Sequence, residues 1–132
     1  MAEKSIITLS NGLRVGNFSS PHPFNFVDGS VLPPADPEDV KCGALTATET
    51  PQPGIKGTTD IDLKFEMSTS CAALLYSWRT LANEDKVDIV LVPLPVKTAL
   101  ERVGTPLRGS PFRVIRVADR TTKAIFIDKF CI

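Results

Sequence analysis

The sequence predicts a single α+β domain, built from a mixed β-sheet with N-terminal and C-terminal hairpins and two amphipathic helices. Three observations predict it: an Asn-Gly pair between two β-branched runs near the start, two stretches with apolar residues at helical spacing, and two strand-like runs at the end. The 132 residues, 42% of them hydrophobic, are enough to bury a core without disulfides or a metal. We therefore expect one domain over residues 1–132.

Two hairpins are predicted in the first 32 residues. The runs with strand character are 5–10, 13–18, 24–27 and 30–32. Asn11-Gly12 separates the first two, and this pair favours a tight hairpin turn because both turn positions need positive φ. Asp28-Gly29 separates the other two and predicts a second turn of the same kind.

Residues 33–57 differ in composition from the rest of the chain. They hold five of the eleven prolines, and only residues 40–48 have strand character. The preceding 32 residues are too few to form an independent domain. We therefore expect a Pro-rich excursion or arm over the surface rather than a domain boundary.

The second half predicts the order β-α-β-α-β-β. Residues 60–67 alternate apolar and charged side chains, which predicts a strand with one buried face and one wet face. One helix is expected over 69–84, with the cap residues among 68–70 at its start. A second is expected over 95–103, ended by Gly104. Their apolar stripes are Cys71, Leu74, Leu75, Trp78, Leu81 and Ala82 in the first and Val96, Ala99, Leu100 and Val103 in the second. Further strands are predicted at 87–92, 112–117 and 122–128, the last two forming a terminal hairpin around the loop 118–121.

Charge and cysteine content narrow the function. Fifteen basic and fifteen acidic residues give zero formal charge, which is atypical of a dedicated nucleic-acid binder. No apolar run reaches the length of a membrane span. The three cysteines are too far apart for a zinc site, and residues 1–4 lack the apolar core of a signal peptide. We expect free thiols, no cofactor, and a cytoplasmic protein that does not bind a membrane.

The junction between the strand at 87–92 and the following helix is the first candidate site. Ligands collect beyond the carboxyl ends of such strands, and the free N–H groups of a helix start favour anions. Lys97 and Thr98 add a charge and a hydroxyl in the first turn. However, Pro95 removes one donor and no Gly-rich phosphate motif occurs. The alternative is an ordinary strand-to-helix connection.

The basic C-terminal half is the second candidate site. Residues 1–66 carry 5 basic and 9 acidic groups, whereas residues 67–132 carry 10 basic and 6 acidic groups. The cations on or beside the terminal hairpin are Arg108, Arg113, Arg116, Arg120, Lys123 and Lys129. Arg113 and Arg116 differ by three positions, so they point to opposite faces of one strand.

A half-buried arginine needs partners for its charge. One interpretation is an internal ion pair with Asp119, Asp128 or an acidic residue of the first half. The other is that Arg113 or Arg116, with Arg120 and Lys123, binds a phosphate or carboxylate group.

Two further sets of residues could carry chemistry. His22, between Pro21 and Pro23, is the only histidine and would have to serve any Ser–His or Cys–His mechanism. A structural or ligand-stacking role is more in keeping with its surroundings. The carboxylates Asp60, Asp62 and Glu66 share one strand face and suit a metal-dependent hydrolase or nuclease, but the solvent face of a strand explains them more simply.

Both ends of the chain resemble a known kind of protein. Residues 9–15 (Leu-Ser-Asn-Gly-Leu-Arg-Val), 21–24 (Pro-His-Pro-Phe) and 113–120 (Arg-Val-Ile-Arg-Val-Ala-Asp-Arg) resemble small uncharacterised accessory proteins of tailed bacteriophages and prophages. The resemblance implies no particular activity. It implies a protein of the host cytoplasm that acts by binding, for example by sequestering a nucleotide signal or masking a host protein.

These observations lead to two functional hypotheses. The first is a non-enzymatic protein that captures a small anionic, nucleotide-like ligand with Lys97, Thr98, the arginines of the terminal hairpin and His22. The alternative is an interaction module that docks a host or phage partner, or a second copy of itself, through its Pro-rich arm and strand edges. On either hypothesis we expect a homo-oligomer.

Overall fold

The computed structural model describes residues 4–102, 104 and 109–132. The predicted residues Val103 and Arg108, and residues 1–3 at the start, lie outside this part. The elements in chain order are β1 (Ile6–Thr8), β2 (Arg14–Asn17), β3 (Phe24–Asn25), β4 (Val31–Leu32), α1 (Pro37–Cys42), β5 (Thr46–Pro53), η1 (Ile55–Gly57), β6 (Thr59–Glu66), α2 (Thr69–Asn83), β7 (Ile89–Leu91), α3 (Leu94–Arg102), β8 (Phe112–Arg113), β9 (Val117–Asp119) and β10 (Ala124–Ile125).

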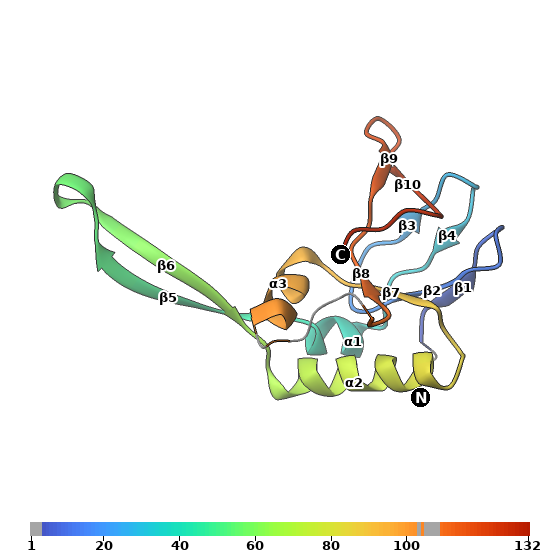
Figure 1. The fold of residues 1–132 in the computed structure, drawn as a ribbon, viewed down its shortest axis with the longest axis horizontal. Coiled ribbons are helices and arrows are strands. Elements are labelled where there is room, and N and C mark those ends of the chain that lie inside the picture. Colours follow the sequence, from blue (N-terminus) through green and yellow to red (C-terminus); the bar gives the residue numbers. More distant parts are fainter. Residues whose placement is uncertain (1–3, 103, 105–108) are drawn as a thin grey trace.

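A four-stranded mixed sheet in the order β1-β2-β7-β8 forms the centre of the body (Figure 1). β1 and β2 are antiparallel, whereas β7 is parallel to both β2 and β8. The β1–β2 hairpin turns at Asn11-Gly12, as the sequence predicts. Gly12 has a φ of 85°, but Asn11 does not have a positive φ, so the expectation that both turn positions do is wrong. The second predicted hairpin is also confirmed, as the antiparallel pair β3–β4. The α+β class is therefore correct.

The sheet is covered on both faces, which makes three layers. One face packs on α2, whose stripe of Cys71, Leu74, Leu75 and Trp78 is buried as predicted. Ser68 begins this helix, since its Oγ accepts a hydrogen bond from the N–H of Cys71 at 3.1 Å. The other face packs under β3–β4 and β9–β10, around Leu9, Val15, Phe26, Leu32, Leu91 and Ile125.

Two side chains in the body are held by dense polar contacts. Arg14 Nε and Nη2 donate to the two carboxylate oxygens of Asp88 at 3.1 and 2.9 Å, and Nη2 also donates to Asp85 at 2.7 Å. These bonds raise the pKa of Arg14 and lower that of Asp88. Asp28 accepts the N–H groups of Ser10 and Ser30, which holds its pKa well below the ordinary range. Together these contacts tie the two N-terminal hairpins to each other and to β7.

The strand predicted over residues 40–48 is correct only for residues 46–48, which begin β5. Residues 40–42 instead belong to α1, in which Pro37 occupies the first turn beside Glu38 and Asp39. Proline and acidic residues in the first turn both favour a helix start. The strand β5 begins only at Thr46, so the projecting part of the chain is residues 46–66 rather than 33–57.

The prediction that the strand at 60–67 buries one face is also wrong. β6 pairs with β5 alone, and of its residues only Phe65 is half-buried, the others being exposed. The alternation is present, but the body of the protein does not reach most of this strand (Figure 1).

The C-terminal hairpin is present but shorter than predicted. The run 112–117 splits into β8, which joins the central sheet, and β9, which pairs antiparallel with β10. The turn between β9 and β10 places Lys123 at a φ of 60°. The split separates Arg113 and Arg116, which are therefore not on one strand.

Candidate functional site

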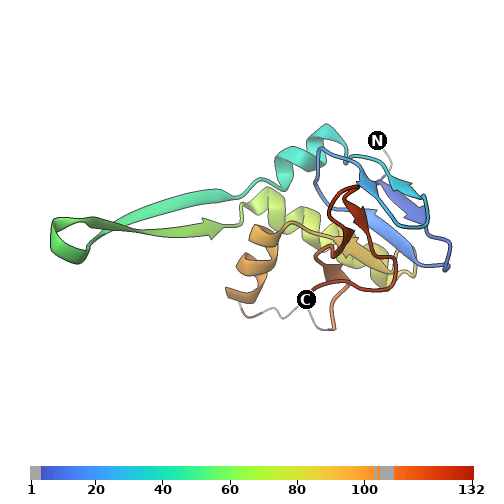
Figure 2. The same cartoon turned by 90° about the horizontal axis from the view of Figure 1, so that it is seen from above.

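A long two-stranded ribbon projects from the body and is the most distinctive surface of the molecule (Figure 2). It consists of β5, the tip η1 and β6, with eight residue pairs from Thr46 and Glu66 at its base to Pro53 and Thr59 near its tip. None of the strand residues is buried. The central sheet does not include either strand, so the ribbon is a separate two-stranded sheet.

The pairing divides the ribbon into two unlike faces. Side chains of directly paired residues lie on the same face of a sheet, and the faces alternate along the strand. One face, called here the apolar face, carries Ala47, Glu49, Pro51, Pro53, Thr59, Ile61, Leu63 and Phe65. The opposite, polar face carries Thr46, Thr48, Thr50, Gln52, Asp60, Asp62, Lys64 and Glu66. The ribbon is therefore amphipathic, although its apolar side chains are largely uncovered: Ile61 is 51% exposed and Leu63 is 46% exposed.

The tip of the ribbon is ordered by its own hydrogen bonds. Gly54 N–H donates to the carbonyl of Thr58 at 2.9 Å, and Thr58 Oγ1 donates to the carbonyl of Ile55 at 2.7 Å. Lys56 and Gly57 both have positive φ, which closes the turn. The tip presents Ile55 with 76% of its surface exposed, next to the cation of Lys56.

A small pocket lies at the base of the ribbon, where α3 packs against the apolar face. It has a volume of about 260 Å³. Its lining residues are Leu63, Phe65, Leu94, Pro95, Thr98 and Arg102. Leu94, at the start of α3, is 59% exposed. The apolar face and this pocket therefore form one continuous apolar surface that ends at α3.

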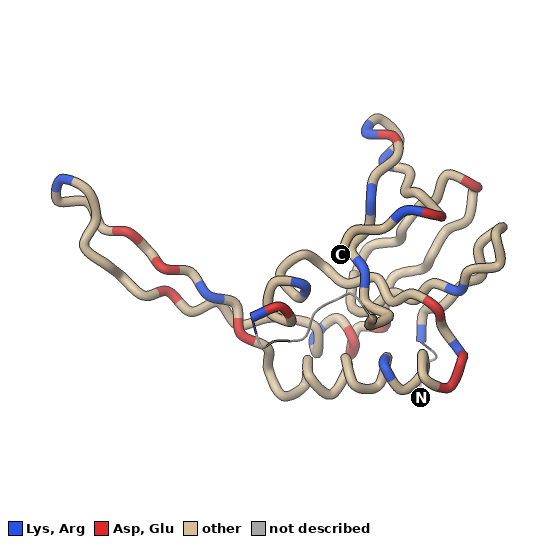
Figure 3. Tube along the Cα trace, in the orientation of Figure 1, with Lys and Arg blue, Asp and Glu red and all other residues tan. Residues whose placement is uncertain are grey.

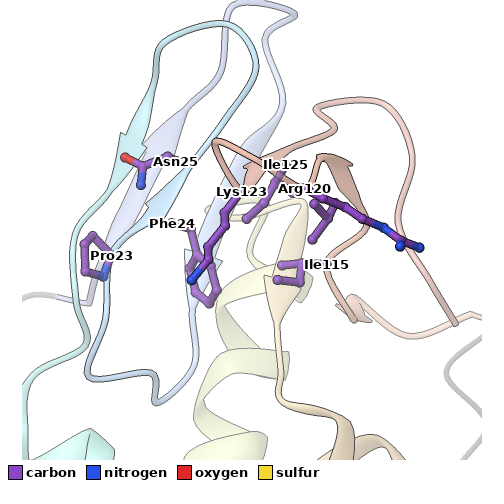
Figure 4. Close-up of a pocket in the computed structure, with 8 residues that line it drawn as sticks. Pro23, Phe24, Asn25, Ile115, Arg120, Lys123 and Ile125 are labelled. Atoms are coloured by element: carbon purple, nitrogen blue, oxygen red, sulfur yellow. The ribbon is translucent and has the colours of Figure 1, made fainter.

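A second pocket, of about 500 Å³, lies between β3 and the β9–β10 hairpin (Figure 4). Its walls are largely apolar, from Phe24, Ile115 and Ile125, and its cations are Arg120 and Lys123. Lys123 extends toward Phe24, whereas the guanidinium of Arg120 points away from it (Figure 4). Two of the predicted ligand-binding residues thus line one cavity.

A third pocket, of about 440 Å³, lies beyond the carboxyl end of β7, the place where the sequence predicts a ligand. Ser19, Ser20, Pro93 and Leu94 contribute to its lining. It shares Phe24 and Ile115 with the second pocket, so the two cavities are neighbours.

Lys97 and Thr98, predicted for the junction at 93–98, do not line this third pocket. Lys97 Nζ lies 3.5 Å from the Glu101 carboxylate one turn later, and Thr98 Oγ1 donates to the carbonyl of Leu94 at 3.2 Å. Thr98 instead lines the pocket at the base of the ribbon. Both side chains bond within α3, which fits the alternative interpretation, an ordinary strand-to-helix connection.

The remaining predicted site residues are not brought together with Arg120 and Lys123. Arg113 is half-buried, and its Nη1 donates to the carbonyls of Ser110 and Phe112, both at 2.7 Å. Arg116 is exposed and lines none of the three pockets. His22 is exposed as well, and its backbone N–H donates to Ser20 Oγ at 3.1 Å. The structure therefore places the predicted residues in several separate surroundings.

The metal-dependent hydrolase reading gains no support from the described residues. Asp60, Asp62 and Glu66 lie along the exposed polar face of the ribbon, where Lys64 Nζ is 3.8 Å from Asp62. Across the ranges that the structure covers, no three metal-ligating side chains cluster.

None of the described helices combines the length and apolar character needed to cross a membrane. The three cysteines are free, and burial raises the pKa of the Cys71 thiol.

The sequence predicts a buried apolar side for residues 60–67, so it does not identify the apolar face of the ribbon as an exposed surface. The signal was present in the alternation of Ile61, Leu63 and Phe65 with charged residues, which indicates a two-faced strand. The alternation does not say whether the apolar side is covered by the same chain. The partner strand β5 carries no such pattern, because Thr, Pro and Gln dominate it.

Comparison with protein-family models, with curated proteins and with solved structures finds no match to this chain. The resemblance of its two ends to phage accessory proteins therefore stays a prediction. What the fold and the surfaces define is an α+β protein with a three-layer body and one projecting amphipathic β-ribbon.

Proposed function

We propose that this chain is a non-enzymatic binding protein whose β5–β6 ribbon docks on another protein surface through its apolar face. The observation that carries the proposal is the ribbon itself. Its eight residue pairs project from the body, none of the strand residues is buried, and one face is predominantly apolar. This is the interaction module of the two sequence-based hypotheses, with its docking element moved from residues 33–57 to residues 46–66.

The low stability expected of an isolated ribbon supports the presence of a partner that covers its apolar face. A two-stranded hairpin with no layer packed on it is only marginally stable in water. Burying apolar surface contributes about 25 cal/mol per Å², so the exposed halves of the Ile61 and Leu63 side chains add no stability until a partner covers them. An exposed apolar patch of this kind is typical of an interaction site.

The edges of the ribbon favour docking through the face rather than by strand addition. Pro51 and Pro53 in β5 have no N–H group to donate to an added strand. The β6 edge carries the charges of Asp60, Asp62 and Lys64, which discourage edge-to-edge pairing. The apolar face has only one charged residue, Glu49.

The experiment compares substitutions on the two faces. The double variant Ile61→Asp, Leu63→Asp places charges on the apolar face, and Thr48→Asp, Thr50→Asp places the same charges on the polar face of the same ribbon. Each tagged protein is purified from the cells that produce it, and the masses of its complexes are measured by native mass spectrometry. We expect a complex, with itself or with another protein, that the first pair abolishes and the second pair preserves. A chain without any complex, or a complex that both pairs leave intact, would contradict the proposal.

A second candidate function, capture of a small anionic ligand, is favoured by the pocket between β3 and β9–β10. Phe24 offers an aromatic surface there, and Lys123 extends toward it. An aromatic ring next to a cation suits a ligand with a planar group and a phosphate, such as a nucleotide. The neighbouring cavity beyond β7 enlarges the available surface.

Thermal denaturation with ATP as the probe tests this candidate. ATP is expected to raise the Tm of the unmodified protein and of Arg116→Ala, which lies outside the pocket, but not of Lys123→Gln. Equal ATP-induced shifts in all three proteins, or none in any, would count against a site at Lys123.

A further inference from the structure

Two of the three cysteines lie beside the base of the ribbon, one before it and one after it in the sequence. Cys42 is the last residue of α1, just before β5, and Cys71 lies in the first turn of α2, just after β6. The first residue pair of the ribbon, Thr46 with Glu66, brings the two connecting segments to one place. The end of α1 and the start of α2 are therefore neighbours.

Lys4 joins α1 to α2 through the faces that carry these cysteines. Its Nζ lies 3.3 Å from a carboxylate oxygen of Asp39 in α1 and 5.5 Å from the centroid of the Trp78 ring in α2. Cys42 follows Asp39 by three residues, so the two share a face of α1. Cys71 and Trp78 belong to one buried stripe of α2. The face of α1 with Cys42 is therefore turned toward the face of α2 with Cys71.

The two helices lie side by side and run in opposite directions, α1 toward the ribbon and α2 away from it (Figures 1 and 2). Both cysteines are thus at the helix ends nearest the ribbon. The end of α1 is held in place, because Gly43 is so close to the side chain of Ser19 that a Cβ atom on Gly43 would collide with it. Cys42, which is half-buried, packs on the core cluster that contains the fully buried Cys71.

The surroundings of the two thiols differ in a way that suits a two-step oxidation. Burial raises the pKa of the Cys71 thiol, and the neighbouring Cys42 raises it further. The one charged residue of α2, Arg79, lies toward the far end of the helix, so the part around Cys71 is uncharged (Figure 3). A buried thiol in apolar surroundings is unreactive by itself. Cys42 is partly exposed and is the thiol that an oxidant in solution can reach.

We infer that Cys42 and Cys71 form a reversible disulfide that fixes α1 to α2 at the base of the ribbon. The oxidant is hydrogen peroxide. The Cys42 thiolate attacks one peroxide oxygen and becomes a sulfenic acid, while the other oxygen leaves as hydroxide and takes up a proton to form water. The Cys71 thiol gives up its proton as its sulfur attacks the Cys42 sulfur, and a second water leaves. The two thiols lose two electrons in total, the peroxide gains them, and a small-molecule thiol reverses the bond by exchange.

The bond would hold a part of the body that packing holds weakly. None of the residues of α1 is buried, so this short helix can separate from α2 at low cost. A disulfide closes a loop that contains the whole ribbon, residues 46–66, and prevents that separation. The bond forms within a single chain, whether or not the ribbon docks on a partner, so the inference goes beyond the proposed function and is tested separately from it.

Peptide mapping of the unmodified full-length protein tests the bond. The reduced protein is treated with hydrogen peroxide, its remaining thiols are alkylated under denaturing conditions, and the tryptic peptides are identified by mass spectrometry without reduction. Trypsin separates the two cysteines at Lys56 and Lys64. We expect at least tenfold more peptide linked through Cys42 and Cys71 than through either of them and Cys131, which is also half-buried. Recovery of Cys71 as an alkylated thiol, or equal linkage to Cys131, would overturn the inference.

Hydrogen–deuterium exchange shows whether the bond fixes α1. Peroxide should slow exchange of the α1 peptide at least tenfold in the unmodified protein and in the matched control Cys131→Ser, and dithiothreitol should restore it. In Cys42→Ser, peroxide should leave exchange of this peptide unchanged. A disulfide that does not slow exchange in α1, or an equal slowing in Cys42→Ser, would show that oxidation does not act through this link and would also overturn the inference.

Discussion

Gly16 of β2 lies directly against the indole of Trp78 in α2, so closely that a Cβ atom on Gly16 would be 2.4 Å from Cζ3 of Trp78. This approach brings the central sheet and α2 together at Trp78, the largest of the fully buried side chains in the described residues. Gly16 is therefore required for packing rather than for its backbone conformation.

We expect Gly16→Ala to lower the free energy of unfolding by about 1–3 kcal/mol, the usual cost of overpacking a close-packed core. Urea denaturation measures it. The double variant Gly16→Ala, Trp78→Phe should show a favourable coupling energy, because the smaller ring gives room to the added methyl group. An unchanged midpoint in Gly16→Ala would mean that the sheet and α2 are not packed as described.

The buried side chain of Asn17 organises the loop that leads to the third pocket. Its amide donates to the carbonyls of Pro33 at 3.1 Å and Ser20 at 3.3 Å, and its carbonyl accepts the N–H of Ser20 at 2.8 Å. Asn17→Ala leaves these groups without their partner and is expected to cost about 1–3 kcal/mol in thermal or urea denaturation. The exposed Asn25 provides the control, and Asn25→Ala should change stability much less. Similar losses in both variants would argue against this role.

The contact between Arg14 and Asp88 predicts a dependence of stability on pH. Hydrogen bonds from Arg14 lower the pKa of Asp88 in the folded protein. A lowered folded-state pKa contributes stability above the unfolded value of about 3.9, and this contribution is lost as the pH falls through the folded value. Asp88→Asn should therefore lose more stability at about pH 7 than at about pH 3. An identical loss at both pH values in urea titrations would show that the charge of Asp88 does not matter.

The parts of the fold predicted from sequence are those with strong local signals. The hairpin at Asn11-Gly12 is predictable because Gly12 readily adopts the positive φ that the turn needs, and α2 follows from Ser68 and a regular apolar stripe. Only residues 46–48 of β5 fall within a predicted strand, because Pro51 and Pro53 are atypical of strands that have neighbours on both sides. A strand with a free edge tolerates Pro51 and Pro53, whereas a central strand does not.

The candidate sites were harder to predict, because side-chain direction depends on tertiary packing. The sequence indicates that Arg113 and Arg120 are close in the chain, but the break between β8 and β9 places one on backbone carbonyls and the other at a pocket. For the ribbon, the sequence likewise does not show whether an apolar face is covered. The alternation around Leu63 indicates an apolar face, but only the structure shows that its own body leaves most of that face uncovered.

The central claim is that the apolar face of the ribbon is covered in the assembled protein. Hydrogen–deuterium exchange of the peptide spanning β6, read by mass spectrometry, tests it most directly, since an uncovered two-stranded ribbon opens and exchanges readily. We predict slow exchange of this peptide in the unmodified, assembled protein and exchange at least tenfold faster in Leu63→Asp, with the α2 peptide unchanged in both. Rapid and equal exchange of the β6 peptide in the two proteins would contradict the account.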